Sequence, residues 1–162
     1  MNNLWAPWRT EYVSGKKDGA CIFCEATKSI PENHKDALVL FKGAVSTVML
    51  NKYPYNNGHL MVSPARHVAR LEEMTPEESI DMFRLLRHCC VVLTKAFNPE
   101  GFNIGMNVGK ASGAGFDDHL HMHIVPRWNG DSNFMPALAE VKVIPEHIAQ
   151  TYSKLKPFFE RI

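Results

Sequence analysis

Hydrophobic and polar positions alternate most regularly near residue 120, where three histidines are interleaved with three large apolar residues. Successive side chains of a β-strand point to opposite faces of its sheet, so the pattern predicts a strand over residues 119–127. The apolar residues are Leu120, Met122 and Ile124, and the histidines are His119, His121 and His123. One face can therefore be buried in a core, while the other carries three imidazoles that a fold has no structural need to build.

Shorter alternating runs predict further strands. They cover residues 37–41, 45–51, 59–63 and 102–108. The first two strands flank a short turn at Lys42-Gly43-Ala44, the second and third flank a loop at residues 53–58, and Pro64 stops the third.

A long helix begins at an unambiguous start signal. Thr75 suits the N-cap, Pro76 suits the first helical position, and Glu78 completes a capping box. Apolar residues then recur at helical spacing, namely Ile80, Phe83, Leu86, Cys90, Leu93 and Phe97. With a shorter helix over residues 146–158, the elements predict an α+β fold in which an antiparallel sheet is combined with one long helix and a shorter C-terminal helix.

Length and composition narrow the class of protein. The chain has 162 residues, of which 45% are hydrophobic and 22% charged, so we expect one domain over residues 1–162 with a sizeable core. A formal net charge of +1 argues against a long nucleic-acid footprint but leaves room for a compact anionic ligand. No apolar run is long enough to span a bilayer, and the N-terminus lacks the apolar segment of a signal peptide, so we expect a cytoplasmic protein with no membrane partner.

The four cysteines fall into two pairs. Cys21 and Cys24 have the Cys-x-x-Cys spacing that, in a reducing compartment, is more often metal-binding or redox-active than a structural disulfide. Cys89 and Cys90 lie in the apolar pattern of the long helix and are interpreted as ordinary small core residues.

A glycine-rich loop leads into the histidine segment. Gly109, Gly113 and Gly115 allow a close backbone approach to a ligand, and successive N–H groups in such a loop can form a nest for an anion. Ser112 adds a hydroxyl and Lys110 a charge. A long hairpin turn is the alternative interpretation, but the position of the loop next to the histidines favours a phosphate cradle.

A phosphate held there would face an imidazole nitrogen. A neutral imidazole can attack phosphorus, which divides one difficult displacement into two easier ones, while a neighbouring histidine serves the leaving oxygen as an acid. The central residue, His121, is the natural nucleophile. The competing hypothesis is a catalytic metal site in which all three histidines act as ligands.

The motif His119-x-His121-x-His123 followed by two apolar residues, together with the preceding glycine-rich loop, resembles the histidine triad family of nucleotide hydrolases and transferases. The resemblance extends to Leu50-Asn51-Lys52-x-Pro54, to Gly58-His59-Leu60-Met61-Val62-Ser63-Pro64 and His67, and to Asn107-x-Gly109 and Pro126-Arg127. It covers roughly residues 21–128 and implies an antiparallel sheet with helices, usually in a homodimer.

The resemblance also implies roles for individual residues. His121 would attack the α-phosphate of a nucleotide, most naturally an adenine nucleotide, and His123 and His119 would position phosphate and transfer protons. His59 would lie behind the triad and Asn51 would reach the ribose. The phosphates would be bound by Asn107, Ser112, Gly113, Ala114 and Gly115. Catalysis in this family needs no metal, but several members bind a structural zinc, whose ligands would here be Cys21, Cys24, His67 and His119.

Two features refine the expected activity. Many members carry Gly-Gln just before the triad, where this chain has the segment 113–118. The segment 128–136 looks like that of the bacterial branch with diadenosine-tetraphosphate phosphorylase activity, which makes inorganic phosphate as well as water a plausible acceptor. The expected function is therefore nucleotidyl transfer from a dinucleoside polyphosphate. The alternatives are hydrolysis of phosphoramidates or adenylates, and a nucleotide-binding sensor module.

Overall fold

A computed structural model describes residues 20–113, 116–131 and 144–160. Its five strands are β1 (Val39–Lys42), β2 (Ser46–Leu50), β3 (Leu60–Pro64), β4 (Gly101–Met106) and β5 (Met122–Arg127). Its α-helices are α2 (Ile22–Lys28), α3 (Pro76–Phe97) and α5 (Ile148–Leu155). Short 3-10 helices are η2 (Pro31–Asn33), η3 (Leu71–Glu73), η4 (Lys110–Ser112) and η5 (Lys156–Phe159).

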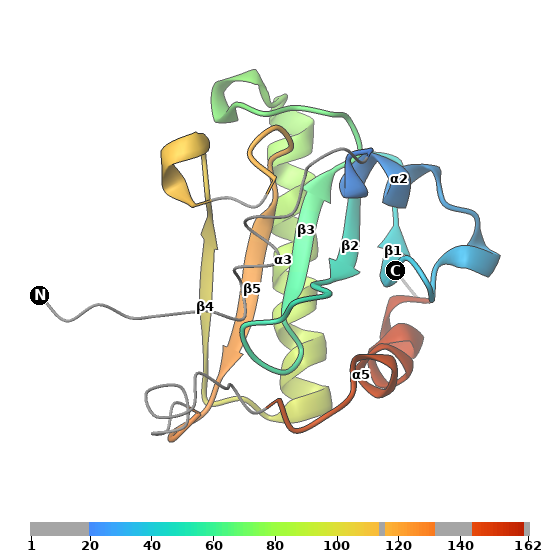
Figure 1. The fold of residues 1–162 in the computed structure, drawn as a ribbon, viewed down its shortest axis with the longest axis vertical. Coiled ribbons are helices and arrows are strands. Elements are labelled where there is room, and N and C mark those ends of the chain that lie inside the picture. The colour runs from blue at the N-terminus through green and yellow to red at the C-terminus, as the bar shows by residue number, and fades with distance from the viewer. Residues whose placement is uncertain (1–19, 114–115, 132–143, 161–162) are drawn as a thin grey trace, which may run out of the picture.

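The strands form one antiparallel sheet in the order β1-β2-β3-β5-β4. The long helix α3 lies behind the sheet, α2 lies at the end nearest β1 and β2, and α5 follows at the lower edge (Figure 1). This arrangement confirms the predicted α+β fold with one long and one shorter C-terminal helix. No helix in the described part of the chain is long and apolar enough to cross a membrane.

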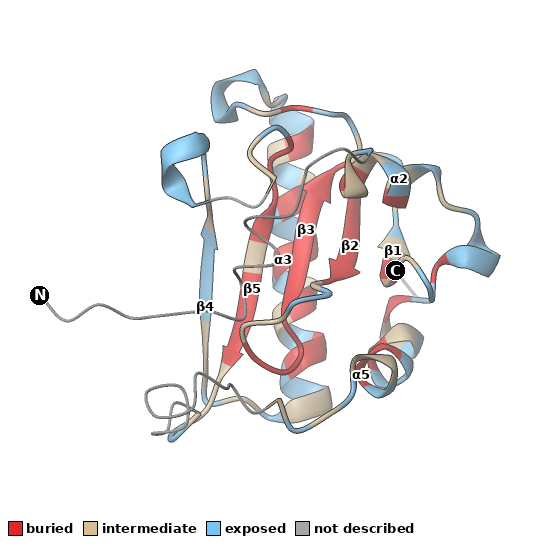
Figure 2. Cartoon of the chain, viewed as in Figure 1, coloured by how far each residue is buried: buried red, intermediate tan, exposed pale blue. Residues whose placement is uncertain are grey.

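The alternation of side chains along the central strands separates two apolar clusters. The larger cluster lies between the sheet and α3 and includes Val48, Leu60 and Ile124. The smaller lies on the opposite face and joins Met49 and Met61 to Phe23 of α2. Because both faces are covered, β2 and β3 are buried along their whole length (Figure 2).

Helix α3 begins where the sequence predicts and is closed by local hydrogen bonds. The Thr75 hydroxyl accepts from the backbone N–H of Glu78, and the Glu78 carboxylate accepts from the N–H of Thr75. The helix ends at Asn98, which adopts a left-handed conformation.

The buried face of α3 matches the predicted one only in part. Leu86 and Leu93 lie in the core as the spacing indicates, but Ile80 and Phe83 are 70% and 59% exposed. The core side chains also include Met82, Leu85 and Cys89. The helix carries apolar residues on two faces, and periodicity alone cannot tell which of them meets the sheet. Cys89 is buried in the core as predicted, and Cys90 packs against the core at its edge.

The histidine strand is shorter than predicted. β5 begins at Met122, so His119 and His121 precede it. The neighbouring strand β3 ends at Pro64, and its pairing with β5 stops at Val62 and Met122. The chain instead makes a single backbone bond, from the N–H of Leu120 to the carbonyl of Val68.

Candidate active site

The candidate site lies on the face of the sheet opposite α3. Three parts of the chain meet there, namely the start of β5 with its histidines, the loop between β2 and β3, and helix α2 with the Cys-x-x-Cys segment. Met122 and Ile124 point into the α3 core, so His123 between them points to the site face, as the alternation predicts.

His121 is buried and its ring is held from two sides. Its Nδ1 lies 2.8 Å from the carbonyl oxygen of His119, and its ring stacks on Phe23 at a centroid distance of 4.5 Å. A carbonyl can only accept, so Nδ1 carries the proton and the lone pair of the neutral ring is on Nε2. Burial lowers the pKa of His121 below the usual histidine value. The neutral ring, which is the nucleophilic form, is therefore favoured near pH 7.

His123 and His59 are joined in a chain of hydrogen bonds that starts from the backbone. The N–H of Tyr55 donates to Nδ1 of His59 over 3.1 Å, which places the proton of neutral His59 on Nε2. Nε2 of His59 lies 3.0 Å from Nδ1 of His123 and donates to it. The proton of neutral His123 is consequently on its own Nε2. The Tyr55 ring stacks on His59 at 5.0 Å and limits its rotation.

Two thiols and two imidazoles form a second cluster beside His121. The ligand atoms of Cys21, Cys24, His67 and His119 all lie within 4.8 Å of one another. Nδ1 of His119 lies 3.3 Å from Sγ of Cys21, and Nδ1 of His67 lies 3.2 Å from Sγ of Cys24. Such a set of two sulfurs and two nitrogens is a common closed tetrahedral environment for zinc.

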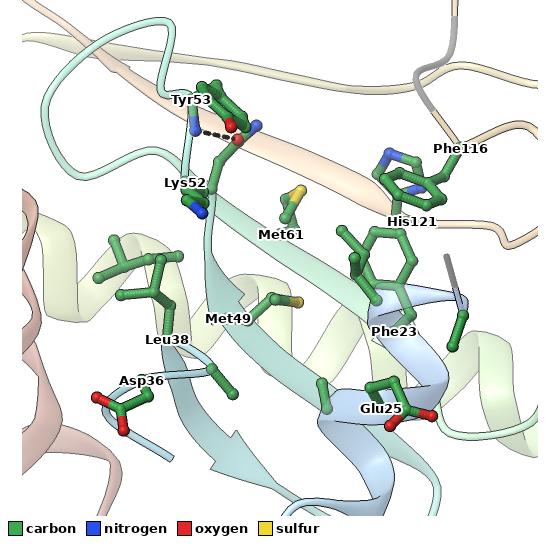
Figure 3. A pocket seen from close by; sticks show the side chains of 16 residues that line it. Phe23, Glu25, Asp36, Leu38, Met49, Lys52, Tyr53, Met61, Phe116 and His121 are labelled. Carbon is green, nitrogen blue, oxygen red and sulfur yellow. Dashed lines mark hydrogen bonds between the residues drawn. The ribbon is translucent and has the colours of Figure 1, made fainter. Parts of the chain in front are cut away.

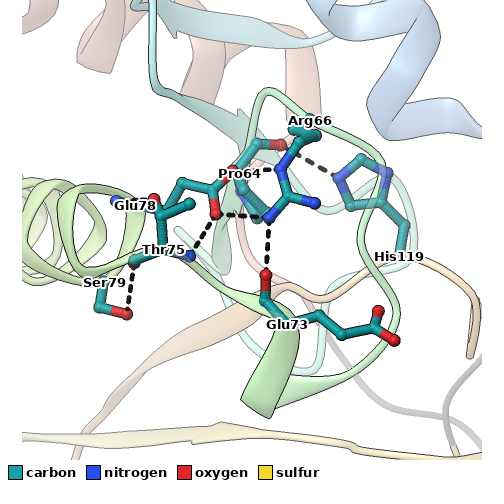
Figure 4. Close-up of polar contacts among 7 residues, drawn as sticks. All are labelled: Pro64, Arg66, Glu73, Thr75, Glu78, Ser79 and His119. Carbon is teal, nitrogen blue, oxygen red and sulfur yellow. Dashed lines mark hydrogen bonds and ion pairs between the residues drawn. The ribbon is translucent and has the colours of Figure 1, made fainter.

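The outer contacts of this cluster also fit a metal. Nε2 of His119 donates to the carbonyl of Pro64 over 3.0 Å, which leaves the lone pair of Nδ1 directed at the cysteines (Figure 4). Metal-bound histidines are typically held in this way. Burial raises the pKa of the Cys21 thiol, and a bound cation would offset that effect by stabilising the thiolate. Both ring nitrogens of His119 are thus engaged away from the pocket.

A pocket of about 410 Å³ opens next to His121. Its walls are mainly apolar and include Phe23, Met49 and Met61, with Phe116 beside His121 (Figure 3). Asn51 also lines it and is held by a hydrogen bond from the N–H of Tyr53 to its Oδ1. The pocket therefore combines an apolar chamber for a flat ring with an imidazole at one end and an amide along its side.

The described residues of the glycine-rich loop do not line this pocket. Asn107, Ser112 and Gly113 follow β4, and none of them is among the residues that line the pocket. Ser112 is exposed and its hydroxyl donates to the carbonyl of Gly109, which closes the turn of η4. Gly109 and Gly113 have φ values of 78° and 80°, which a side chain would strain, so a turn accounts for both glycines. Ala114 and Gly115 lie outside the described residues.

Sequence reasoning missed three residues that shape the site. Phe23 stacks on His121, the candidate nucleophile, and Tyr55 fixes the tautomer of His59. Asn56 anchors the loop between β2 and β3, which carries Tyr55 and His59. The aromatic residue inside the Cys-x-x-Cys segment was a usable signal for Phe23. Nothing local marks Asn56, because its partners Pro126 and Asp131 are 70 and 75 positions away. Tyr55 acts on the nearby His59 through its backbone N–H, a group that every residue except proline has.

Comparison with known proteins adds independent findings. A model of the HIT domain family matches residues 32–130. The chain is 36% identical over 157 residues to an AP-4-A phosphorylase of Mycobacterium tuberculosis, with 93% of this chain and 80% of that protein covered. It is 32% identical over 130 residues to an adenosine 5'-monophosphoramidase of Schizosaccharomyces pombe, with 80% and 90% covered.

Solved structures share the fold. A Zn-bound histidine triad family protein from Mycobacterium smegmatis superimposes with a TM-score of 0.67 at 21% identity, covering 88% of this chain and 94% of that one. A HIT family protein from Bacillus subtilis superimposes with a TM-score of 0.60 at 26% identity, covering 69% and 76%.

Proposed function

Because this chain belongs to the HIT domain family, we propose that it transfers nucleotidyl groups from dinucleoside polyphosphates such as diadenosine tetraphosphate. The observation that carries the proposal is the state of His121: its Nδ1–H is held by a carbonyl, so the Nε2 lone pair is available beside an apolar pocket of suitable size. The similarity to an AP-4-A phosphorylase over most of both chains supports the substrate class.

The proposed reaction has two displacements at one phosphorus. Nε2 of His121 attacks the α-phosphate, the P–O bond to the remaining polyphosphate breaks, and a nucleotidyl-histidine forms. The N–H at Nε2 of His123 donates a hydrogen bond to the leaving oxygen and stabilises the charge that develops on it. An oxygen of phosphate or water then attacks, the P–N bond breaks, its electron pair returns to Nε2 of His121, and the proton of the attacking group is released to solvent. Phosphate yields ADP and water yields AMP.

The pocket supplies the proposed binding contacts. The adenine ring would lie between Phe23, Met49 and Met61, and the Oδ1 and Nδ2 atoms of Asn51 would reach the ribose. We propose that the phosphates are bound by the backbone of the glycine-rich loop, over residues 107–115.

Product analysis tests the function. Diadenosine tetraphosphate is incubated with the full chain, with and without inorganic phosphate, and the nucleotides are separated by chromatography. Formation of ADP and ATP that depends on phosphate supports a phosphorylase, and AMP with ATP in both cases supports a hydrolase. Absence of turnover in both cases contradicts the proposal.

A second candidate is hydrolysis of phosphoramidates or adenylates through the same intermediate. The similarity to an adenosine 5'-monophosphoramidase over 80% of the chain favours it. Release of AMP from adenosine 5'-phosphoramidate, at a higher kcat/KM than from diadenosine tetraphosphate, would select this candidate. Tight nucleotide binding without turnover of either substrate would instead indicate a sensor module.

We also propose a structural zinc and a homodimer. Cys21, Cys24, His67 and His119 would hold the metal, which would stabilise the thiolates and fix the start of α2. The edge strand β4 would face a second copy of the chain. In the described part of the chain no strand covers the outer edge of β4, and Ile104 of this strand is exposed.

A further inference from the structure

The loop between β2 and β3 controls a proton position in the candidate site. Its Tyr55 N–H donates to Nδ1 of His59, and through His59 this bond decides which nitrogen of His123 carries the proton. A displacement of Tyr55 would leave Nδ1 of His59 without this donor. Neutral His59 could then carry its proton on Nδ1, and its Nε2 could accept from Nδ1 of His123. Both tautomers would be reversed.

Asn56, the next residue of this loop, is anchored to the far end of β5. Its side chain is buried, with 5% exposed. Its Nδ2 donates over 3.0 Å to the carbonyl of Pro126 and over 2.8 Å to Oδ2 of Asp131. Two acceptors on one amide nitrogen fix both its position and its orientation, and the backbone carbonyl of Asn56 accepts from the N–H of His59.

The acceptor at Asp131 is itself held rigidly. Arg127 donates to both carboxylate oxygens, from Nε over 2.6 Å and from Nη2 over 2.7 Å. The N–H of Trp128 donates to Oδ2 over 3.1 Å. Bidentate arginine–carboxylate pairs are strong and directional, so the Asp131 carboxylate is a fixed reference point for Asn56.

The neighbouring Asn57 does not duplicate this anchor. Its Oδ1 accepts from the hydroxyl of Thr151 in α5, so it joins the loop to the C-terminal helix instead of to β5. Of the two asparagines, Asn56 is the one whose side chain bonds to β5, the strand that carries His123. Asn56 therefore fixes the position of Tyr55, the first donor of the hydrogen-bond chain, relative to His123, its last acceptor.

We propose that Asn56 is a positioning residue that, held by Asp131, aims the Tyr55 N–H at His59 and so keeps the proton of His123 on Nε2. The role in turnover rests on the proposed function, in which the N–H at that nitrogen donates to the leaving oxygen. The role in selecting the tautomer does not depend on any substrate.

The test compares Asn56→Ala with Asn103→Ala in the full chain. Asn103 accepts from Nη1 of Arg127 over 2.6 Å, so its removal disturbs the same network but leaves the Asn56–Asp131 bond in place. Imidazole nitrogens are observed by NMR after labelling histidine with ¹⁵N, which distinguishes protonated from unprotonated nitrogens. We expect a protonated Nε2 at His123 in the wild type and in Asn103→Ala, and a mixture of tautomers in Asn56→Ala.

Kinetics provides the second readout. We expect kcat for diadenosine tetraphosphate to fall about tenfold to a hundredfold in Asn56→Ala, with KM changed less than about threefold, because a hydrogen-bond donor to the leaving oxygen and not a contact with the bound substrate is lost. A folded Asn56→Ala protein with the wild-type tautomers would overturn the inference. If this variant does not fold, Asn56→Ser, whose single hydroxyl cannot reach both acceptors, replaces it under the same criterion.

The two proposals fail separately. If the wild type turns over no nucleotide but Asn56→Ala still shifts the tautomers, the proposed function is wrong and the positioning role stands. If the wild type is active and the tautomers of Asn56→Ala are unchanged, the positioning role is wrong and the proposed function stands.

Discussion

At the scale of single residues, His121 is the group on which the proposed chemistry depends most. Replacing it with alanine removes the Nε2 that would attack phosphorus, while the other walls of the pocket remain. We expect kcat to fall about a thousandfold or more and nucleotide affinity to change little. Turnover is measured by chromatography and affinity by titration with a nonhydrolysable analogue.

The matched control for this variant is His147→Ala, which removes an exposed imidazole at the start of α5. Its turnover should stay within about twofold of the wild type. A His121→Ala protein that retains more than a few per cent of the activity would disprove the assignment of the nucleophile.

At the scale of elements, the start of α3 should make stability depend on pH. The Glu78 carboxylate accepts from Arg66 at Nε and Nη2 and from the N–H of Thr75, whereas Arg66 also donates to the carbonyl of Glu73 (Figure 4). The hydrogen bonds from Arg66 are the main cause that lowers the pKa of Glu78 below its usual value. The ionised form is therefore favoured by folding.

The sign of the dependence follows from linkage. Since the folded pKa is below the unfolded one, the stabilisation is present above the unfolded value and is lost as the pH falls through the folded value. Glu78→Gln keeps a side chain that can accept in the capping box but removes the charge. We expect it to cost about 1 kcal/mol of unfolding free energy at pH 7 and progressively less below about pH 4.5.

Urea denaturation of the wild type and of Glu78→Gln between pH 3 and pH 7 measures this difference. Glu72→Gln is the control, because Glu72 is exposed and pairs with the exposed Arg70. A destabilisation by Glu78→Gln that is equal at all pH values would show that the ion pair is not its source.

Helix α2 provides the second prediction at this scale. Its first turn holds Cys24 in the metal cluster and Phe23 against His121, so loss of zinc should loosen one wall of the pocket. Cys24→Ser should lower both the bound zinc, measured by elemental analysis, and the melting temperature. Free zinc at a thousand times its dissociation constant would stabilise the folded protein by about 4 kcal/mol, so the shift in melting temperature should be readily measured.

Cys90→Ser is the control for this variant, because Cys90 is a partly buried thiol outside the cluster. It should keep its zinc. A wild-type protein purified without any chelator that contains no zinc would contradict the proposed metal site.

Several elements were predictable because their signals are local. The start of α3 depends on three residues within one turn, and the orientation of His123 follows from its neighbours Met122 and Ile124. Other features depend on partners far along the chain. β5 begins at Met122, where its pairing with Val62 of β3 and Met106 of β4 begins. Helix α2 has seven residues and no side-chain cap, and it packs on the sheet through Phe23.

The same contrast applies to the candidate site. The cluster of Cys21, Cys24, His67 and His119 was expected from the family resemblance, and the structure brings the four residues together. The bond between Asn56 and Asp131 joins residues 75 positions apart in the sequence, and neither periodicity nor spacing predicts such a pair.

At the scale of the whole molecule, the exposed apolar surface points to a second copy of the chain. Among the described residues the sheet ends at β4, whose residue Ile104 is 47% exposed, and Ile80 and Phe83 are exposed on α3. An uncovered edge strand can pair with another strand, and pairing between two copies would satisfy both edges by symmetry. The proposed homodimer would therefore place β4 of one protomer against β4 of its partner.

The dimer is tested by light scattering coupled to size-exclusion chromatography. Ile104→Glu brings a charge into the proposed interface, where its desolvation is unfavourable, and should convert a dimeric wild type into a monomer. Ile30→Glu is the control, because Ile30 is also exposed but precedes η2 in the segment between α2 and β1. A wild type that is monomeric at micromolar concentration would refute the dimer. If Ile104→Glu is a monomer with full activity, each protomer contains a complete site, as expected when His121, His123 and His59 all come from one chain.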